Sequence, residues 1–329
     1  MTALKQSAKS WREQVMNIRS KYNFSAICFF LSAVCMALTG CSKSAMYSKQ
    51  IGFASSDQAA NAFVKAVREN NNHELLKIFG PEAKELIWSG DKVRDQQRRE
   101  AFLKAYYEQH RIESQGNKWV LVVGKNDWPF PIPIIQENSK WVFDTESGKE
   151  EILNRRIGRD ELDTIQTMLA IVDAQREYAM RDPDYDKIHV YAQKFQSDPG
   201  KKNGLYWETK PGEEPSPLGP LVAQAREQGY FKNTSSEPVP YHGYYFKMLT
   251  AQGLHAQGGE YNYIVDGKMY GGFAVIAYPA EYGNSGIMTF IVNNDGVVYQ
   301  KDLGRDTEQI AMAMKLFDPD ETWTRVASD

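Results

Sequence analysis

The distribution of charge and of cysteine separates the first 41 residues from the rest of the chain. Residues 24–40 carry no charged side chain, and five basic residues precede them. A stretch of this length is shorter than most membrane-spanning helices and is typical of the hydrophobic part of a secretory signal. All the cysteines, Cys28, Cys35 and Cys41, lie in or directly after this stretch. The remaining residues can therefore form neither a disulfide framework nor a cysteine metal site.

The composition of the chain is that of a globular protein. Hydrophobic residues make up 42% and charged residues 25% of its 329 residues, which is ordinary for folded domains. This length predicts roughly two domains. The formal net charge is -3, and it becomes -7 when the first forty residues, with five basic groups and one acidic group, are left out. Such an acidic body argues against nucleic acid as a partner, because a protein that follows a nucleic-acid backbone needs a basic stripe.

The uncharged stretch leads into residues 38–41, which read LTGC and resemble the lipobox of bacterial lipoproteins. The resemblance implies cleavage before Cys41, a diacylglycerol on its sulfur and acylation of its new amino group, so that lipid anchors the protein in a membrane. Ser42 follows, where an aspartate would favour the inner membrane, so the resemblance implies the periplasmic face of the outer membrane. An uncleaved anchor and an ordinary signal are the alternatives, and translation can start at Met1 or Met16.

The part of the chain after the leader divides into a tether and two expected domains. Residues 41–52 are polar and are expected to form the tether, 53–158 a first α+β domain and 159–329 a second one. Ser55 stands three residues before Gln58, a capping-box pattern that predicts the start of a helix. The periodicity of the first domain predicts helices over 57–70, 75–78, 81–88 and 95–110, followed by strands over 119–123, 128–134 and 140–144.

Prolines occupy every second position of the strand predicted over residues 128–134, at Pro129, Pro131 and Pro133. Alternate residues of a strand direct their N–H groups to the same side, so one side of this strand lacks three donors. The pattern predicts an edge strand whose prolines face away from its neighbour. A proline-rich docking motif is the alternative interpretation.

Helices followed by a curved antiparallel sheet resemble the cone-shaped fold of nuclear-transport-factor-like domains. Cones of this kind often hold a pocket, which implies a small-ligand site or an enzyme site in the first domain. We expect Trp88, Tyr106, Trp119 and Phe143 to line such a pocket. The alternative is that these aromatic side chains fill the hydrophobic core.

The second domain is expected to begin with a long helix. Residues 150–157 predict a short helix that ends at Gly158, and a one-sided apolar stripe predicts the longest helix over 160–181. Strands are expected over 243–249, 272–277, 287–292 and 297–299, with an Asp-Gly hairpin turn between the last two and a helix over 307–316. A long helix before an antiparallel meander resembles the globular head of bacterial pilin-like proteins, and such heads chiefly make protein contacts. The helix is amphipathic and internal, so the resemblance does not imply filament assembly through it.

Several stretches together resemble one bacterial family, the domain-of-unknown-function family 2950. They read WPFPIP at 128–133, ILNRRIG at 152–158, DAQREY at 173–178, YHGYYF at 241–246 and YPAEYG at 278–283. The resemblance covers nearly all of the chain after the leader. It implies a bacterial lipoprotein and supplies no catalytic or binding residue.

Asp182, Asp184 and Asp186 have the spacing of the first ligands in a calcium-binding loop, where carboxylate oxygens surround a hard cation. Such a loop normally has glycine at its sixth position and glutamate at its twelfth, and this chain has Lys187 and Gln193 there. We therefore expect a solvated acidic turn at a helix end, with calcium binding as the alternative. No other cofactor is expected.

The remaining candidate residues form no recognised catalytic pattern. None of the five histidines is paired with another at metal-ligand spacing. His242 could act as a base, and a surface or capping histidine is the simpler interpretation. Arg155 and Arg156 could bind an acidic partner or interact with a helix dipole. The sequence therefore predicts a non-catalytic envelope protein that binds an unidentified envelope partner or gives structural support. A small-ligand binder or enzyme using the first domain, and a calcium-responsive module, are the alternatives.

Overall fold

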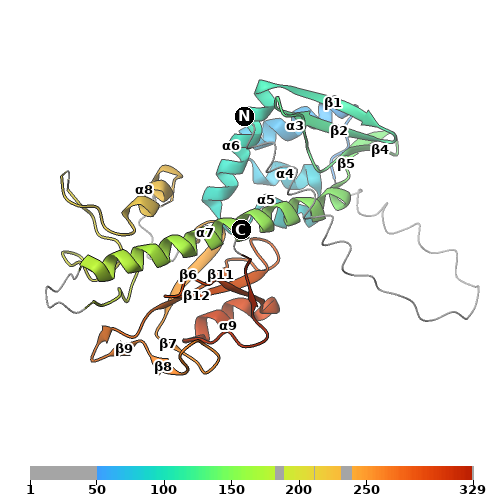
Figure 1. Ribbon diagram of the computed structural model, residues 1–329. Coiled ribbons are helices and arrows are strands. Elements are labelled where there is room, and N and C mark those ends of the chain that lie inside the picture. The colour runs from blue at the N-terminus through green and yellow to red at the C-terminus, as the bar shows by residue number, and fades with distance from the viewer. Residues whose placement is uncertain (1–49, 182–188, 211, 231–238, 328–329) are drawn as a thin grey trace, which may run out of the picture. The chain divides into compact units, whose positions relative to one another are not determined.

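The computed structural model describes residues 50–181, 189–210, 212–230 and 239–327. Helices and mainly antiparallel sheets both contribute to the fold, which confirms the predicted α+β class (Figure 1). The helices are α3 (Ser56–Arg68), α4 (Asn72–Phe79), α5 (Lys84–Ile87), α6 (Lys92–Glu108), α7 (Thr145–Arg181), α8 (Gly219–Glu227) and α9 (Thr307–Ala313), with short turns η1 (Pro81–Ala83) and η2 (Gly304–Asp306).

The strands are short, and most of them belong to two five-stranded sheets. The first sheet contains β1 (His110–Gln115), β2 (Lys118–Val123), β3 (Trp128–Pro129), β4 (Ile134–Glu137) and β5 (Lys140–Phe143). The second contains β6 (Tyr244–Leu249), β11 (Ala274–Pro279), β12 (Met288–Asn293), β13 (Tyr299–Asp302) and β15 (Thr324–Arg325). The smaller sheets are formed by β7 (Ala251–Gln252), β8 (Tyr261–Asn262) and β14 (Leu316–Phe317), and by β9 (Ile264–Val265) and β10 (Lys268–Met269).

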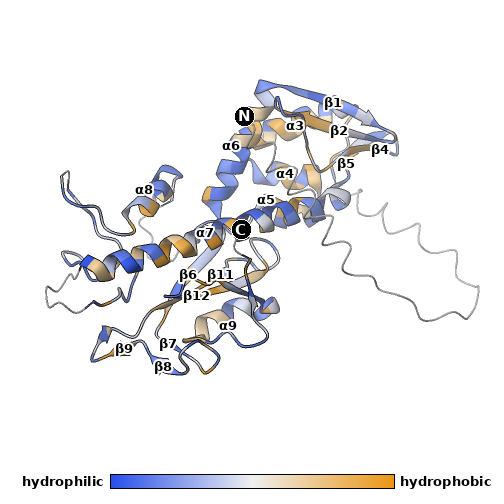
Figure 2. Ribbon diagram, in the orientation of Figure 1, coloured by the Kyte–Doolittle hydropathy of each residue, from blue (hydrophilic) through white to orange (hydrophobic). Residues whose placement is uncertain are grey.

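Helices α3 to α6 share one hydrophobic core with the first sheet. The predicted start of the first helix is confirmed, because the Ser55 hydroxyl accepts a hydrogen bond from the backbone N–H of Gln58 at 3.1 Å. Phe63 on the buried face of α3 lies 5.7 Å from the ring of Phe143 in β5. Figure 2 shows hydrophobic residues along β2 and β4 in this part of the molecule. Full burial of one such phenylalanine contributes about 1.5–3 kcal/mol.

The proline-rich segment forms an edge strand over its first residues only. β3 pairs with β2, and the N–H of Phe130 donates to the carbonyl of Leu121 at 2.7 Å, as the alternation of donors predicts. The prediction of one strand up to Ile134 is wrong. The chain bends over Pro131 to Pro133, and Ile134 begins β4, which pairs with both β2 and β5. Two of the missing donors therefore fall in a bend, where proline is well tolerated.

The predicted helix end at Gly158 is wrong, because α7 runs without interruption from Thr145 to Arg181. A glycine inside a helix costs about 0.5–1 kcal/mol relative to alanine. Packing at both ends of α7 outweighs that cost. Ile152 packs against the first core, whereas Met168 belongs to a second, separate core. The expected boundary between residues 158 and 159 thus lies inside one helix, and the division into two domains stays a prediction.

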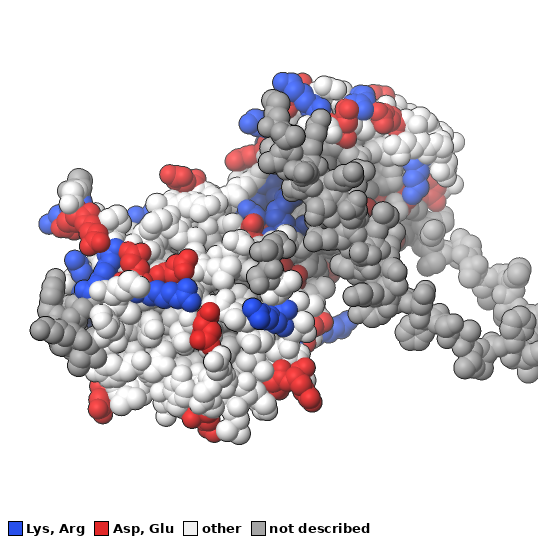
Figure 3. All heavy atoms as spheres, viewed as in Figure 1, with Lys and Arg blue, Asp and Glu red and all other residues white. Residues whose placement is uncertain are grey.

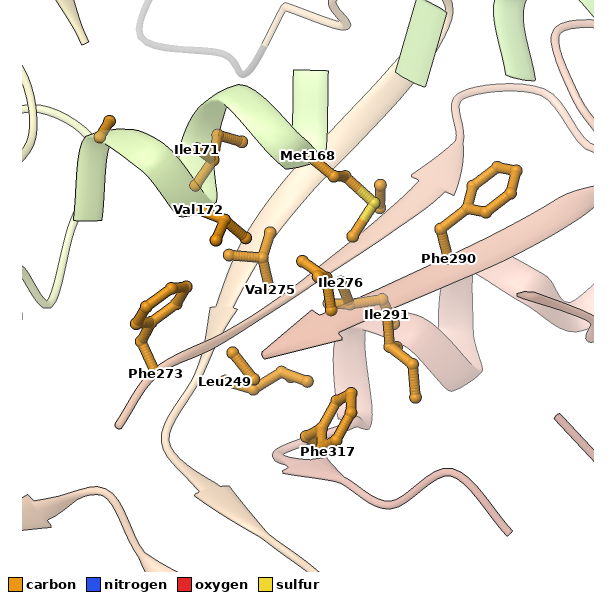
Figure 4. Close-up of a cluster of buried hydrophobic side chains, with 14 of the residues drawn as sticks. Met168, Ile171, Val172, Leu249, Phe273, Val275, Ile276, Phe290, Ile291 and Phe317 are labelled. Carbon is orange, nitrogen blue, oxygen red and sulfur yellow. The ribbon is translucent and has the colours of Figure 1, made fainter. Parts of the chain in front are cut away.

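The second core lies between α7 and the second sheet, whose strand order is β15-β13-β12-β11-β6. Figure 4 shows Met168 and Val172 of α7 beside Val275 of β11 and Ile291 of β12. The predicted hairpin is confirmed, since β12 and β13 pair on either side of the Asp-Gly turn. The likeness of this half to a pilin head stays a prediction.

Residues 50–52 belong to the folded body and not to a tether. The side-chain amide of Gln50 donates to the carbonyl of Phe79 at 2.6 Å, and the N–H of Ile51 donates to the carbonyl of Lys77 at 3.0 Å. A tether after the leader would therefore end before Gln50. Within the described ranges, no helix has both the length and the apolar composition needed to cross a membrane.

Candidate functional site

A cavity of about 420 Å³ lies among helices α3 to α7 and the first sheet. Its volume is within the range of small-molecule sites in proteins. Its apolar lining consists of Phe63, Val67, Leu75, Phe79, Leu86, Ile87, Ala101, Phe102, Ala105, Val123, Trp128, Phe130, Pro131, Ile132 and Ile152. Its charged lining consists of Asp95, Arg98, Arg99, Arg155, Arg156 and Arg159.

Aromatic rings and the proline bend form the apolar wall of the cavity. The ring centroid of Phe63 lies 4.8 Å from that of Phe130 and 5.1 Å from that of Phe102, which are distances of direct ring contact. Pro131 and Ile132, which interrupt the predicted strand, are part of the same wall. The proline pattern therefore shapes the cavity as well as ending the pairing of an edge strand.

The aromatic residues expected to line a pocket do not line this cavity. Tyr106 and Phe143 are buried in the first core. Trp119 packs edge-on against Trp141 with ring centroids 4.3 Å apart, and Trp88 packs against the outside of the core. The alternative interpretation, in which these side chains fill the core, holds for Tyr106 and Phe143, whereas Trp88 and Trp119 are partly buried and pack against the core.

Five arginines line one part of the cavity. Arg98 and Arg99 come from α6, and Arg155, Arg156 and Arg159 come from α7. Residues three and four positions apart share one face of a helix, so Arg159 lies beside both Arg155 and Arg156. A group of basic side chains is visible near the middle of the face shown in Figure 3, in the region where α6 approaches α7 in Figure 1.

Arg156 is a buried guanidinium without a carboxylate partner. Its side chain is held by the backbone carbonyls of Glu85 and Leu86, at 2.6 and 2.8 Å, and by the amide oxygen of Asn284. The residue is only 6% exposed, and its Nε has no hydrogen-bond partner. Burial, with the nearby charge of Arg98, lowers the pKa of Arg156 to about 10. The site therefore contains a positive charge that the surrounding side chains only partly compensate.

Two other arginines of the cavity also lack an ion pair. Arg99 donates to the carbonyl of Ile87 at 3.1 Å and to the side chain of Asn70. Arg159 makes neither a hydrogen bond nor an ion pair within the described part of the chain. Partial desolvation, together with the neighbouring guanidinium groups of Arg98 and Arg94, lowers the pKa of Arg159.

The remaining charged lining residues are paired. Arg155 forms an ion pair with Glu151, and its guanidinium lies 5.8 Å from the ring centroid of Trp128. Asp95, the carboxylate in the lining, accepts hydrogen bonds from the backbone and the hydroxyl of Ser89 at 3.0 and 2.7 Å. Arg98 is paired with Asp160 and Arg155 with Glu151, so the positive charge of this part of the cavity comes from Arg99, Arg156 and Arg159.

A buried network behind the cavity joins α6 to α7. Arg98 donates to both oxygens of Asp160 at 2.7 and 2.8 Å, and Nε of Arg94 lies 3.5 Å from the same carboxylate. Asp160 is fully buried. Burial raises its pKa, although both arginines oppose this shift. Removing one partner of such a buried pair costs about 3–5 kcal/mol, so this network fixes the two helices against each other.

The same network reaches the loop that contains His242. Nδ1 of His242 lies 2.9 Å from the carboxylate of Asp163, which also binds Arg94, and Nε2 lies 3.2 Å from the side-chain oxygen of Gln228. His242 is buried and does not line the cavity. The histidine that the sequence suggested as a base thus takes part in an internal polar network. That position also excludes the simpler interpretation of a surface residue.

Asp91 makes a further link between the helices and the His242 loop. Its carboxylate caps α6 by accepting from the N–H of Arg94, and it also accepts from the hydroxyl of Tyr230 at 2.6 Å and from the N–H of Gly243 at 3.1 Å. Burial and the nearby Asp91 raise the pKa of Tyr230. The Tyr230 hydroxyl is therefore a permanent donor in a structural network.

The chemistry of the cavity favours binding over reaction. The lining residues include no serine, threonine, cysteine, histidine, lysine or tyrosine. Nucleophilic catalysis needs a nucleophile close to a base, and Asp95, the carboxylate of the lining, is engaged by Ser89 and Arg98. The lining residues provide an apolar volume and cationic groups, which suit an apolar ligand with an anionic group.

The structure does not describe most of the residues singled out as sites in the sequence. Cys41 and the acidic residues Asp182, Asp184 and Asp186 lie outside the described residues. Among the residues that are described, no group of three or more histidine, cysteine, aspartate and glutamate side chains is arranged to hold a metal ion. The pair of Arg155 and Arg156 is the one sequence suggestion that falls in the cavity.

Comparison with known proteins identifies the family. The sequence model of the family described as "Protein of unknown function (DUF2950)" matches residues 50–326. The chain belongs to this family. Comparison with curated proteins and with solved structures gave no significant match. Membership covers both halves of the fold and the whole cavity, and it assigns no role to any residue.

Proposed function

We propose that this protein is a lipid-anchored binding protein of the bacterial envelope, which holds a small, largely apolar ligand in the cavity of its first half. The observation that carries the proposal is the 420 Å³ cavity itself, with fifteen apolar lining residues. Small-molecule sites are typically concave, mostly apolar pockets of about this volume. The volume and the apolar lining together therefore support a bound ligand.

The leader supports the location of this function. Residues 38–41 read LTGC, and a lipidated Cys41 would keep the folded body near a membrane surface. Apolar molecules concentrate in membranes, so a cavity carried on such an anchor is close to a supply of ligand. We place the protein on the periplasmic face of the outer membrane, because Ser42 and not aspartate follows the cysteine. Interaction with another envelope protein stays a prediction from the sequence.

A photoreactive neutral probe tests the binding function. The full chain, purified in detergent, is irradiated with a long-chain alcohol that carries a diazirine, and the labelled peptides are mapped by mass spectrometry. We expect labelling to concentrate on the peptides that contain Phe102 and Trp128, which line the cavity.

A matched pair of variants separates the cavity from general surface binding. Ala101 is an exposed lining residue on α6, so Ala101→Trp should block the cavity and reduce its labelling at least tenfold without disturbing the core. Gln96 is exposed on the same helix and does not line the cavity, so Gln96→Trp should leave labelling unchanged. Labelling that is spread over the surface, or that survives Ala101→Trp, would contradict the proposed function.

A further inference from the structure

We infer that the ligand is an anionic amphiphile, whose carboxylate or phosphate head group binds among Arg99, Arg156 and Arg159 while its apolar chain fills the cavity. This inference rests on the proposed function, since it names the chemical class of the ligand that the cavity holds. Its evidence is independent, because it comes from the charged and not from the apolar part of the lining.

The first argument is the charge balance of the site. No carboxylate of the described residues lies within 4.0 Å of the guanidinium groups of Arg99, Arg156 or Arg159. Arg156 is the buried member of this group, and a buried charge without a counter-ion is costly, so proteins usually pair it or neutralise it. The lining carboxylate, Asp95, already accepts two hydrogen bonds from Ser89 and lies 3.6 Å from Nη1 of Arg98. A negative charge from outside the chain would complete the site.

The second argument is the supply of donors. Nε of the buried Arg156 has no hydrogen-bond partner, although buried donors are normally satisfied. Arg159 makes no hydrogen bond or ion pair within the described residues, and among carboxylates only the more distant charges of Asp160 and Asp163 act on it. A planar guanidinium binds carboxylate and phosphate oxygens through paired hydrogen bonds. The free donors of this cluster match such a head group.

The third argument is that the arginines and the apolar wall belong to one cavity. Arg155 lies over the ring of Trp128, at 5.8 Å, and Arg156 lies one helical turn from Ile152 on α7. A neutral lipid would fill the apolar volume and leave the arginines uncompensated. A small inorganic anion would bind the arginines and leave the apolar volume empty. An anionic amphiphile satisfies both parts of the site.

A purely structural role does not account for the whole cluster. Arg98 binds Asp160, and Arg156 binds Asn284 and the last carbonyls of α5, so both help to hold the fold together. Arg159 makes no such contact. It is exposed on the same face of α7 and lines the cavity, which makes it the best residue for a test.

The test compares three diazirine probes that share one alkyl chain and differ in the head group, which is a carboxylate, a phosphate or a hydroxyl. Apparent affinity is measured on the full chain from the concentration dependence of labelling at Trp128. We expect the carboxylate, the phosphate or both to bind at least tenfold more tightly than the alcohol. That ratio corresponds to about 1.4 kcal/mol. We also expect salt to weaken binding of the charged probes more than that of the alcohol.

Arginine variants show whether the cluster causes this preference. Arg159→Gln should lower the affinity for the anionic probes roughly threefold and leave the alcohol unchanged, because a charge-assisted hydrogen bond is lost. Arg159→Lys should restore part of the difference. Arg176→Gln is the matched control, since Arg176 lies on α7 and does not line the cavity. Each probe also partitions into the detergent, which changes its apparent affinity for the variants and for the unchanged protein by the same factor. The ratio of these affinities is therefore not affected.

The outcomes distinguish this inference from the function on which it rests. Equal binding of all three probes in the cavity would overturn the anionic head group and leave the binding function intact. If Arg159→Gln lowered the affinity for the alcohol probe as much as that for the carboxylate and phosphate probes, the inference of an anionic head group would also be overturned. Absence of cavity labelling by every probe would overturn both proposals. Competition by inorganic phosphate alone, at the concentration of the alkyl phosphate, would show a free-anion site and refute the role of the chain.

Discussion

Two glycines of α7 should respond to alanine in opposite directions. Gly148 lies near the start of the helix, and a Cβ placed on it would meet the carbonyl oxygen of Pro131 and Cγ1 of Ile132, both at 2.7 Å. A Cβ on Gly158, in the helix interior, would meet nothing within 4 Å. The same substitution in one helix therefore adds a methyl group to a crowded position or to open space.

The magnitudes follow from these distances. Alanine is favoured over glycine inside a helix by about 0.5–1 kcal/mol, so Gly158→Ala should stabilise the protein by that amount. Forcing a methyl group into packed surroundings costs about 1–3 kcal/mol. At Gly148 the contact includes backbone of the cavity wall, which moves less easily than a side chain. After the helix gain is subtracted, we expect Gly148→Ala to destabilise the protein by about 1–2 kcal/mol.

Urea unfolding of the full chain, followed by tryptophan fluorescence, measures both values. If the two cores unfold separately, the transition of the first core carries the effect of Gly148→Ala. Destabilisation by Gly158→Ala would show that α7 is broken there, as the sequence alone suggests. Stabilisation by Gly148→Ala would refute the close contact between α7 and the proline bend.

Other parts of the chain give further predictions. Cys41→Ala should abolish acyl labelling and release the protein from membranes, and labelling that persists would remove the lipoprotein interpretation. Calcium should not raise the melting temperature; a clear rise that disappears in Asp184→Ala would show that the acidic turn is a calcium site. Burial opposes ionisation of Asp163, but His242 and Arg94 lower its pKa overall. Its stabilising effect should therefore be complete above about pH 4 and be lost at lower pH. Urea titrations between pH 3 and 7 should show a flatter pH dependence for Asp163→Asn, and an unchanged slope would contradict the ion pair.

Local patterns in the sequence predicted the elements whose cause is local. The hydroxyl of Ser55 does cap α3, and the predicted Asp-Gly turn does join β12 to β13. The prediction that a helix ends at Gly158 was wrong, because the packing that holds α7 together comes from residues remote in the sequence. β1 was missed, because its sequence HRIESQ is polar and has no strand-like alternation. An exposed edge strand of this kind depends on its pairing partner.

The site was only partly predictable for the same reason. The proline alternation correctly indicated one-sided pairing near Phe130, but not that the bend after it would form a cavity wall. The adjacent pairs Arg98-Arg99 and Arg155-Arg156 were visible signals. Each pair is also compatible with a solvated helix face, and only the tertiary structure places α6 and α7 at one cavity. The charge imbalance depends on which carboxylates are near, and sequence spacing does not show this.

Identification of the proposed ligand would test the central claim most directly. The full chain is purified gently from the cells that produce it, and material extracted from it under denaturing conditions is analysed by mass spectrometry. A lipid bound covalently at Cys41 would stay with the protein and would not interfere. We predict about one equivalent of an acyl-chain carboxylate or phosphate, which is lost in Ala101→Trp and retained in Gln96→Trp. Equal amounts of extracted lipid from both variants would contradict the account.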